Sequence, residues 1–496
     1  MTVRWLFAGQ LGAAFDDGGP VLLVESRAAF GRAPMHRQKA HLILSAIRHR
    51  AAELGTRAEF RQVERFGDAV DGRDDLEVIA PPSRAARTAV RRRGIPMLPS
   101  RGFATAEADF AEWISGRGAR RTRMEDYYAW VRERTGLLMR GPDPAGGRLN
   151  LDRENRHPPP KGAVTLGLPE PRWPDEDDID REVRADLDRW EAAGLLRLIG
   201  ADGPRRFAVT GAEAERAVDD FIESRLGDFG PFEDAVLEHD WVMAHSLLSV
   251  PLNLGLLDPL RLAQRVATEY DAGRAPLPSV EGFVRQVVGW RDWVWHLYWH
   301  LGPDYVRESN LLEANRPVPR PFATLDPDGV DAACLRATLG DVRDRGWAHH
   351  IQRLMVLGNW GLQRGVDPAA LSDWFAGAFV DRTPWVMPAN VVGMSQYADG
   401  GRVATKPYAA GGAYLDRMTD YCGGCRFDPR TRVGPDACPF TAGYWAFLDR
   451  AESKLRGNHR MAQPLAGLRR LSDRAAVVAQ ERARDEEGEG FGPAPT

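Results

Sequence analysis

Three of the four cysteines in this 496-residue chain lie in one short stretch, DYCGGCRFDPRTRVGPDACPF at residues 420–440. Cys422 and Cys425 form a CxxC pair, Cys438 follows after twelve residues and precedes a proline, and Cys334 lies far upstream. Four thiolates suit a tetrahedral zinc ion or a cubane iron–sulfur cluster. Unrelated buried cysteines are the third interpretation. The Cys–Pro ending slightly favours iron–sulfur, because bacterial ferredoxin runs end in the same way.

A second group of reactive residue types lies in RGWAHHIQRLM at 345–355. His349 and His350 are adjacent, so on the helix expected here they point about 100° apart and do not face one site equally. Taken alone, a hydrogen-bonded core histidine is the ordinary interpretation. Histidine also titrates near neutral pH and can move a proton. Arg353, three residues further on, can face the same side of the helix as His350.

Two other stretches carry polar groups suited to binding. In HSLLS, Ser246 and Ser249 can donate hydrogen bonds to phosphate oxygens, although a capped helix is the plainer interpretation. In EGFVRQVVGWRDW, Arg285 and Arg291 lie six residues apart and Trp290 precedes the second. By itself this pattern is typical of an amphipathic core helix with solvated arginines.

Composition limits the class of protein that holds these groups. With 66 Lys+Arg against 70 Asp+Glu the net charge is −4, which excludes a generally basic, histone-like protein. No apolar run approaches the roughly 18–20 residues of a membrane span, and the N-terminus lacks a signal-peptide core. Four cysteines in such a length do not suggest a secreted disulfide framework. We therefore expect a cytoplasmic protein with no membrane partner.

The elements that must position these groups fall into three parts. Residues 1–135 alternate short apolar runs (VRWLFAG, PVLLVES, LEVIAP) with helical stretches such as MHRQKAHLILSAIRHRAAEL, which predicts a parallel α/β domain. Residues 136–205 are rich in proline, glycine and charge, which predicts a linker over the surface. Residues 206–484 predict a large all-α domain, and residues 485–496 a disordered tail.

Many separate stretches, in one order, match a known family. They include HSLLS, VEGFVRQVVGWRD, AHHIQRLMVLGN, VVGMSQYADGG, TKPYAAGGAYLDRMTDYCGGC, DACPF and NHRMAQP. The chain resembles the iron–sulfur bacterial cryptochromes and photolyases, the group that contains the prokaryotic (6-4) photolyases. The resemblance covers nearly the whole chain and implies the photolyase/cryptochrome fold, with a Rossmann-like N-terminal domain and a helical FAD-binding domain.

The resemblance also implies cofactors and their residues. Cys334, Cys422, Cys425 and Cys438 would hold a [4Fe–4S] cluster, and FAD would lie inside the helical domain. A 6,7-dimethyl-8-ribityllumazine antenna is a further implied cofactor. The residues assigned to FAD are His245, Ser246, Leu247, Leu248, Ser249, Glu281, Arg285, Trp290, Arg291, Asn359, Asp381, Met387 and Asn390.

The activity implied is light-driven electron transfer to a pyrimidine photoproduct flipped out of UV-damaged DNA. His350 would donate a proton to the lesion, with His349, Arg353 and Tyr408 as further catalytic residues, and Arg353 would pair with Asp381 beside the flavin. DNA binding would use Lys406 and the arginines of RGNHRMAQPLAGLRRLSDR. The protein is expected to act as a monomer.

Several positions depart from the family pattern. Met387 places a thioether where the relatives carry an amide or acid facing flavin N5. Trp374 fits the first aromatic of the photoreduction chain, but Phe375 replaces the expected tyrosine, which predicts another route for reduction through Trp293, Trp295 and Trp299. Ala29 stands where an acidic contact to the antenna is expected.

Three functions remain consistent with the sequence. The leading one is a (6-4) photolyase that repairs DNA. The second is a cryptochrome-type blue-light receptor with the same cofactors, which Met387 and Phe375 favour. The third is a nucleic-acid-binding protein whose metal site is purely structural.

Overall fold

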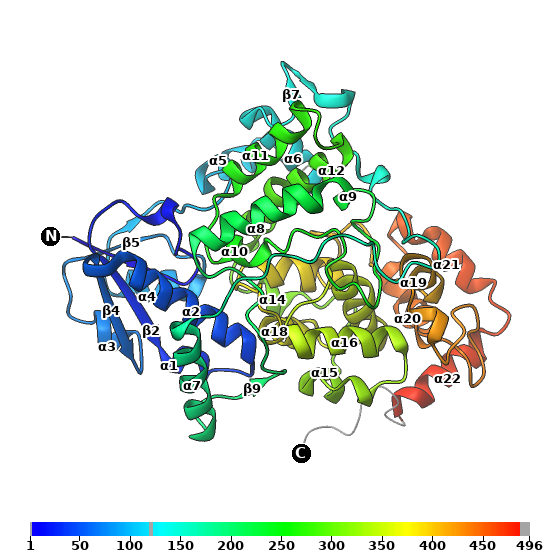
Figure 1. Ribbon diagram of the computed structural model, residues 1–496. Coiled ribbons are helices and arrows are strands. Elements are labelled where there is room, and N and C mark those ends of the chain that lie inside the picture. The colour runs from blue at the N-terminus through cyan, green and yellow to red at the C-terminus, as the bar shows by residue number, and fades with distance from the viewer. Residues whose placement is uncertain (1, 119–122, 487–496) are drawn as a thin grey trace.

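The N-terminal part of the chain folds around a five-stranded parallel sheet of order β4-β2-β1-β5-β6. The computed structural model describes residues 2–118 and 123–486 (Figure 1). The inner strand β2, which lies between β4 and β1, is buried along its whole length, as expected for a parallel strand covered on both faces. The predicted α/β domain is therefore confirmed. The strands are β1 (Val3–Leu6), β2 (Val21–Ser26), β4 (Ala58–Val63), β5 (Leu76–Ile79) and β6 (Met97–Leu98).

The predicted linker contains a helix of its own. Helix α7 (Asp178–Ala192) packs on α2 (Arg37–Leu54), where Val183 and Leu187 share an apolar cluster with Leu44. Valine and leucine four residues apart form one apolar stripe, which the surrounding charged residues obscure in the sequence. The segment 136–205 is therefore only partly a surface connection, because α7 completes the covering of the N-terminal unit.

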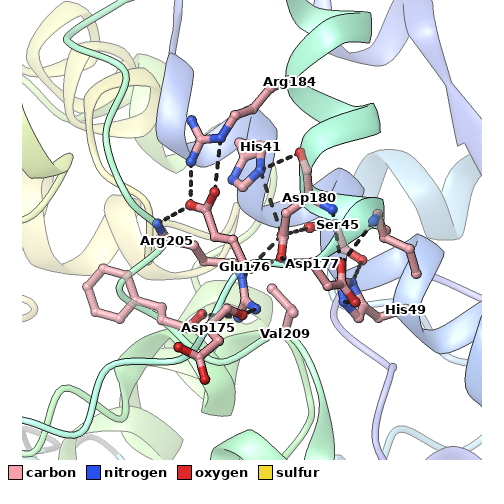
Figure 2. Close-up of polar contacts among 12 residues, drawn as sticks. His41, Ser45, His49, Asp175, Glu176, Asp177, Asp180, Arg184, Arg205 and Val209 are labelled. Carbon is pink, nitrogen blue, oxygen red and sulfur yellow. Dashed lines mark hydrogen bonds and ion pairs between the residues drawn. The ribbon is translucent and has the colours of Figure 1, made fainter.

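A buried polar network joins α2 to α7 and to the chain that follows (Figure 2). Asp180 is fully buried; its carboxylate accepts a hydrogen bond from Ser45 and pairs with Arg205, whose guanidinium also binds Glu213 at 2.8 Å. His49 Nε2 lies 3.2 Å from Asp177. Buried charges persist only when they are paired in this way, so the network fixes the linker on the N-terminal unit.

Two helices of the predicted first domain belong to the helical body instead. Phe110 of α5 (Glu107–Ser115) and Tyr127 of α6 (Met124–Thr135) pack on Trp293, with ring centroids 6.0 and 5.5 Å away. These two helices lie on the helical body because their aromatic side chains pack against those of α13 (Asp292–His300). The α/β unit itself therefore ends soon after β6.

The predicted all-α part, residues 206–484, is confirmed, and the C-terminal helices lie at the end of the molecule opposite the sheet (Figure 1). Among the described helices, none combines the length and the apolar character needed to cross a membrane. Further helices are α8 (Gly211–Ser224), α10 (Ser249–Asn253), α11 (Pro259–Asp271), α12 (Leu277–Val284), α16 (Ala333–Arg345), α17 (Asn359–Arg364), α18 (Pro368–Ala378), α19 (Gly412–Met418), α20 (Pro439–Leu455), α21 (Ala462–Arg469) and α22 (Arg474–Glu486).

Three π-helical stretches extend or interrupt these helices: η5 (Arg285–Arg291), η7 (Gln352–Gly358) and η8 (Pro388–Ser395). π-helical turns are rare and frequently lie at functional sites, because the wider turn re-aims side chains. Arg285, Trp290, Arg291, Arg353 and Asn390, all assigned to chemistry from the sequence, lie in these three stretches.

The predicted disordered tail begins too early. Asp485 lies in α22, where its carboxylate binds Arg364 at 3.1 Å and Arg316 at 2.5 Å. These ion pairs hold the end of the helix on the body, although the sequence DEEGEG suggests disorder. Residues 487–496 lie outside the described residues.

Candidate functional site

The four cysteines line one pocket, although Cys334 lies 88 residues before Cys422 in the sequence. Cys334 lies in the first turn of α16, and Cys438 is the N-cap of α20. Cys422 lies within the 3₁₀ turn η9 (Tyr421–Gly424), and Cys425 follows that turn directly. Helix N-termini favour negative charge, so two of the four sulfurs lie where a thiolate is stabilised. All four are free thiols.

The rest of the pocket is apolar. Burial raises the pKa of Cys334 well above its usual range, and the neighbouring cysteines raise it further; burial likewise raises the pKa of Cys422 to about 12. Buried thiols whose pKa is raised in this way are unfavourable as anions unless a metal compensates their charge. The other lining residues are Ala332, Gly412, Leu415, Tyr421, Phe427, Pro439 and Phe440.

Glycine at position 412 is required by this geometry. A Cβ there would lie 2.9 Å from Cys438 Sγ and 2.8 Å from Thr441 Oγ1, too close for either atom. Gly412 N instead donates to Thr441 Oγ1 at 2.9 Å. The donor set and this close approach fit a metal centre ligated by four sulfurs.

Helix α22 holds the loop that connects Cys425 to Cys438. Gly434 N donates to Gln480 Oε1 at 2.7 Å, Arg432 pairs with Asp473 at 2.8 Å, and Arg484 donates to Ala437 O at 2.9 Å. Buried Arg364 ties the same helix to the start of α20 through Glu481 and Pro439 O. The C-terminal helix is therefore part of the frame of the cysteine pocket, which sequence analysis did not predict.

Both histidines of the HH pair face one site, which differs from the expected 100° separation. His349 lies outside the helix, and Ile351 N donates to His349 Nδ1 at 3.0 Å, so His349 caps the helix that begins at His350. The two rings stack with centroids 4.6 Å apart. Because an extended residue is not bound by the helical period, adjacent side chains can lie face to face.

His245 of HSLLS completes the group. Its Nε2 is hydrogen-bonded to His349 Nε2, and the ligand atoms of the three imidazoles lie within 4.8 Å of one another. Burial lowers the pKa of His245 to about 3, and burial lowers the pKa of His349 well below its usual range. Both are therefore neutral near pH 7, and only His350 is exposed.

His350 has an acidic partner that sequence analysis missed. His350 Nε2 lies 3.1 Å from Asp234 Oδ1. Burial acts to raise the pKa of Asp234, but the hydrogen bond and charge of His350 outweigh it and the pKa lies below its usual value. The neighbouring Glu233 is buried, which raises its pKa to about 7. No local signal in the sequence links residues 234 and 350.

Arg353 and Asp381 form the pair that the family resemblance implies. Two nitrogens of Arg353 reach the Asp381 carboxylate at 2.8 and 3.0 Å, and Ser249 Oγ donates to the same carboxylate at 3.0 Å. Asn253 Nδ2 holds the Asp381 carbonyl at 2.7 Å. The HSLLS stretch and helix η7 are thereby joined through one carboxylate.

Strain marks the HSLLS stretch. Leu247 has φ of 56°, in the left-handed region that a branched side chain rarely adopts. Ser246 Oγ accepts from Leu248 N at 3.4 Å, and Leu248 is buried. Such strain persists only where the surroundings impose it, and it is common at ligand-binding turns.

The other residues assigned to the flavin divide into two sets. Buried Arg285 lies 3.4 Å from both Glu281 and Glu233, and Glu281 Oε1 and Arg285 Nε have no hydrogen-bond partner among the described residues. Arg291 points elsewhere, donating to Gly102 O at 3.0 Å, and half-buried Trp290 packs on the main core. The structure therefore does not direct Arg285 and Arg291 to one partner.

Asn359 and Met387 have packing roles. Fully buried Asn359 donates to Ala410 O at 2.8 Å, which positions the TKPYAAGG loop that carries exposed Lys406 and half-buried Tyr408. Burial raises the pKa of Tyr408. Met387 is buried in the core beside the start of η8, and half-buried Asn390 lies one turn further on.

The arrangement of an α/β unit and a helical body recurs in solved structures. The structure of a bacterial class III photolyase from Agrobacterium tumefaciens aligns with 100% of this chain, and the alignment includes 92% of the photolyase chain. The TM-score is 0.53 and the sequence identity 16%. The cryptochrome of Synechocystis sp. PCC6803 covers 98% and 94%, with a TM-score of 0.54 at 12% identity. The fold is that of the photolyases and cryptochromes.

Sequence comparison narrows this class. Residues 8–195 match the family model described as deoxyribodipyrimidine photo-lyase-related protein. A (6-4) photolyase of Agrobacterium fabrum is 38% identical over 478 residues, which is 91% of each chain. This chain therefore belongs to the family of photolyase enzymes that includes that bacterial (6-4) photolyase.

Proposed function

We propose that this protein repairs (6-4) pyrimidine photoproducts in UV-damaged DNA under blue light, with bound FAD as the electron donor. One observation carries the proposal: the exposed His350 lies 3.1 Å from the Asp234 carboxylate and beside two histidines, His245 and His349, that are neutral. The likeness to a (6-4) photolyase along 91% of the chain supports it.

The residues present fit a flavin. Ser249, Arg353 and Asp381 form one hydrogen-bonded group beside a strained turn. In the helical body, Glu281 Oε1 and Arg285 Nε lie 3.4 Å apart and have no hydrogen-bond partner among the described residues. Ser246, Ser249 and Arg353 would hold the flavin's anionic and carbonyl groups. When bound, FAD supplies a light-excited one-electron donor.

The proton chemistry belongs to the chain itself. His350 Nε2 lies 3.1 Å from Asp234 Oδ1 and the ring is exposed, so a base flipped from the duplex could reach it and take a proton from it. The contact with Asp234 would hold the His350 ring in position. His349 and His245 are neutral, and their stacked and hydrogen-bonded rings orient His350 without competing as acids.

For the cysteine pocket we propose a [4Fe–4S] cluster, bound by Cys334, Cys422, Cys425 and Cys438. The four free thiols and the apolar lining fit either centre, and the family resemblance supports the cluster over zinc. Iron and sulfide analysis of the purified protein distinguishes these two centres, and a zinc content of one atom per chain would overturn the cluster.

A lumazine antenna remains a prediction. Half-buried Ala29 packs against the cluster of Phe30, Leu44 and Val183 and supplies no carboxylate to such a pigment. Extraction of the purified protein followed by fluorescence of the released pigment tests whether lumazine is bound.

A blue-light receptor is the second candidate, because Met387 and Phe375 replace groups with redox or proton chemistry by groups without it. Illumination of the reduced protein with (6-4)-damaged oligonucleotide separates the two functions. Repair establishes the photolyase, whereas flavin bleaching without repair indicates the receptor. A colourless protein without flavin would contradict both and favour nucleic-acid binding alone.

The histidine assignment has its own test. His350→Ala should retain flavin and lower the repair rate by about 10²–10⁴-fold, the usual contribution of a general acid. His239→Ala removes another exposed histidine and should repair normally. Full repair by His350→Ala would remove the acid role from this residue.

A further inference from the structure

Trp374, the predicted first aromatic of the photoreduction chain, is surrounded by aromatic rings that are hard to oxidise. Trp374 has Phe322, Phe375 and Phe379 as its ring neighbours, with centroids 5.1, 4.9 and 6.0 Å away. Its indole nitrogen donates to Phe322 O at 2.7 Å. Phenylalanine is not readily oxidised, so an electron hole on Trp374 has no onward step through the aromatic contacts of the described residues.

The route through Trp295 and Trp299 faces a different barrier. The two rings lie 5.4 Å apart, but the Arg87 guanidinium lies 3.6 Å over the Trp299 ring. Arg84 covers the adjacent Tyr298 ring at 3.9 Å. A cation on the ring face stabilises the neutral ring and raises the energy of a radical cation there. An electron hole is therefore unfavourable on Trp299, at the outer end of this route.

A third line of tryptophans continues from ring to ring, and its neighbouring guanidinium groups lie at its two inner rings rather than at its outer end. The rings of Trp347 and Trp241 are 5.4 Å apart, and those of Trp241 and Trp173 are stacked at 5.5 Å. Trp347 is buried, whereas Trp241 and Trp173 are half-buried. These residues come from the turn after α16, the turn before HSLLS and the linker, so only the tertiary structure places them in line.

The inner end of this line lies in the candidate site. The Trp347 ring is 5.6 Å from the Arg353 guanidinium and 6.5 Å from the His245 ring. Gly346 makes the turn that positions Trp347: it has φ of 59°, and a Cβ there would lie 2.7 Å from Val380. Trp347 is therefore held beside the residues assigned to the flavin.

Charge also favours outward movement of a hole. Arg353 lies near Trp347, and Arg345 and Arg206 lie 5.0 and 6.0 Å from the Trp241 ring. Within residues 2–118 and 123–486 no guanidinium is stacked on Trp173. Since each cation raises the energy of a neighbouring radical cation, the hole is most stable on Trp173.

We propose that Trp347, Trp241 and Trp173 form the electron relay that reduces the flavin in light; this rests on the proposed function, because it requires bound FAD. With FAD bound, the Trp347 indole would give up one electron to it under illumination. Trp241 and then Trp173 refill the hole in turn. A soluble thiol supplies the electron at Trp173 and is oxidised towards its disulfide, with loss of its proton to water.

The test uses the flavin-loaded full chain with Trp347→Phe, Trp241→Phe and Trp173→Phe. Trp374→Phe and Trp295→Phe are the matched controls. Flavin content and melting temperature are measured first. The samples are then illuminated without oxygen in the presence of dithiothreitol, while flavin absorbance and the transient absorption of the tryptophan radical are followed.

Trp347→Phe and Trp241→Phe should lose most of the photoreduction and the long-lived tryptophan radical. Trp173→Phe should shorten the lifetime of that radical, and both controls should match the natural protein. Natural rates in Trp347→Phe and Trp241→Phe, or loss of reduction in a control, would overturn the relay.

A second variant covers failure to fold. If Trp347→Phe does not retain flavin, Trp347→Tyr keeps a ring that can be oxidised, and it should give partial photoreduction with a tyrosyl signal. Photoreduction at the natural rate without a tyrosyl signal would overturn the relay. Natural protein that binds no flavin would overturn the proposed function and the relay with it, whereas normal flavin with unaffected Trp variants would overturn the relay alone.

Discussion

The cysteine pocket and the histidine site differ in whether their reactive groups have partners within the protein. In the pocket, four thiols face one another across an apolar lining, and burial raises the pKa of Cys334, Cys422 and Cys438. In the histidine site, each charged group already has a protein partner, as in His350 with Asp234 and Arg353 with Asp381.

The difference shows which region depends on a bound group. The proposed metal centre would neutralise the sulfurs of the cysteine pocket, so we expect the stability of this region to be coupled to metal loading. The histidine site is organised before any ligand arrives, which is the arrangement expected of a catalytic site. The following predictions are ordered from the largest expected effect to the smallest.

Removing one sulfur should have the largest effect. Cys334→Ala should lose the metal and destabilise the C-terminal half, because a ligand is missing from a site whose binding energy is part of the folding energy. Metal analysis and thermal unfolding measure this. Tyr421→Phe alters the same lining without removing a sulfur and should retain the metal. Unchanged metal content in Cys334→Ala would exclude Cys334 as a ligand.

Breaking a pair in the histidine site should have an intermediate effect. Asp381→Asn leaves the guanidinium of Arg353 without its anion in a largely buried position, and should cost about 2–3 kcal/mol of unfolding free energy. Urea denaturation of the metal-loaded protein measures it. Asp331→Asn, which breaks the exposed pair with Arg426, should cost about 0–1 kcal/mol. Equal costs would show that the two sites are equally solvated.

The pH dependence of stability tests the burial of Glu233. Its pKa of about 7 lies above the ordinary value of 4.5, so between these values the folded state holds a proton that the unfolded chain has released. Stability should therefore fall as pH rises from about 4.5 to about 7. Glu233→Gln should resemble the natural protein at pH about 5 and lose this fall, as melting temperatures would show.

The control for this prediction is Glu238→Gln, which alters an exposed carboxylate nearby and should leave the pH profile unchanged. A profile of Glu233→Gln that follows the natural protein from acid to neutral pH would mean that Glu233 is ionised in the folded state throughout this range.

Weakening the contact between α22 and the loop that connects Cys425 to Cys438 should have the smallest effect. Gln480→Ala removes the acceptor of Gly434 N and should cost about 1 kcal/mol while hastening metal loss in air. Gln480→Glu keeps that acceptor and is the matched variant. Metal release followed by absorbance distinguishes them, and identical rates in both variants and the natural protein would show that α22 does not hold the loop.

Part of this site could be predicted from residue types and order alone. The cysteine set, the HH pair and the Arg353–Asp381 assignment come from motifs whose order matches a family, and the strands follow from short apolar runs. Such features are local, because the spacing of apolar and chemically distinctive residues is preserved in the chain itself.

The remaining features were decided by tertiary structure. His349 faces the same site as His350 because it precedes the helix, and helix boundaries are the least predictable feature of a pattern. Asp234 meets His350 across 116 residues, and Trp173, Trp241 and Trp347 meet from three loops. Loops have no period, so contacts between them are set by the long-range packing of the helices that carry them rather than by any local signal.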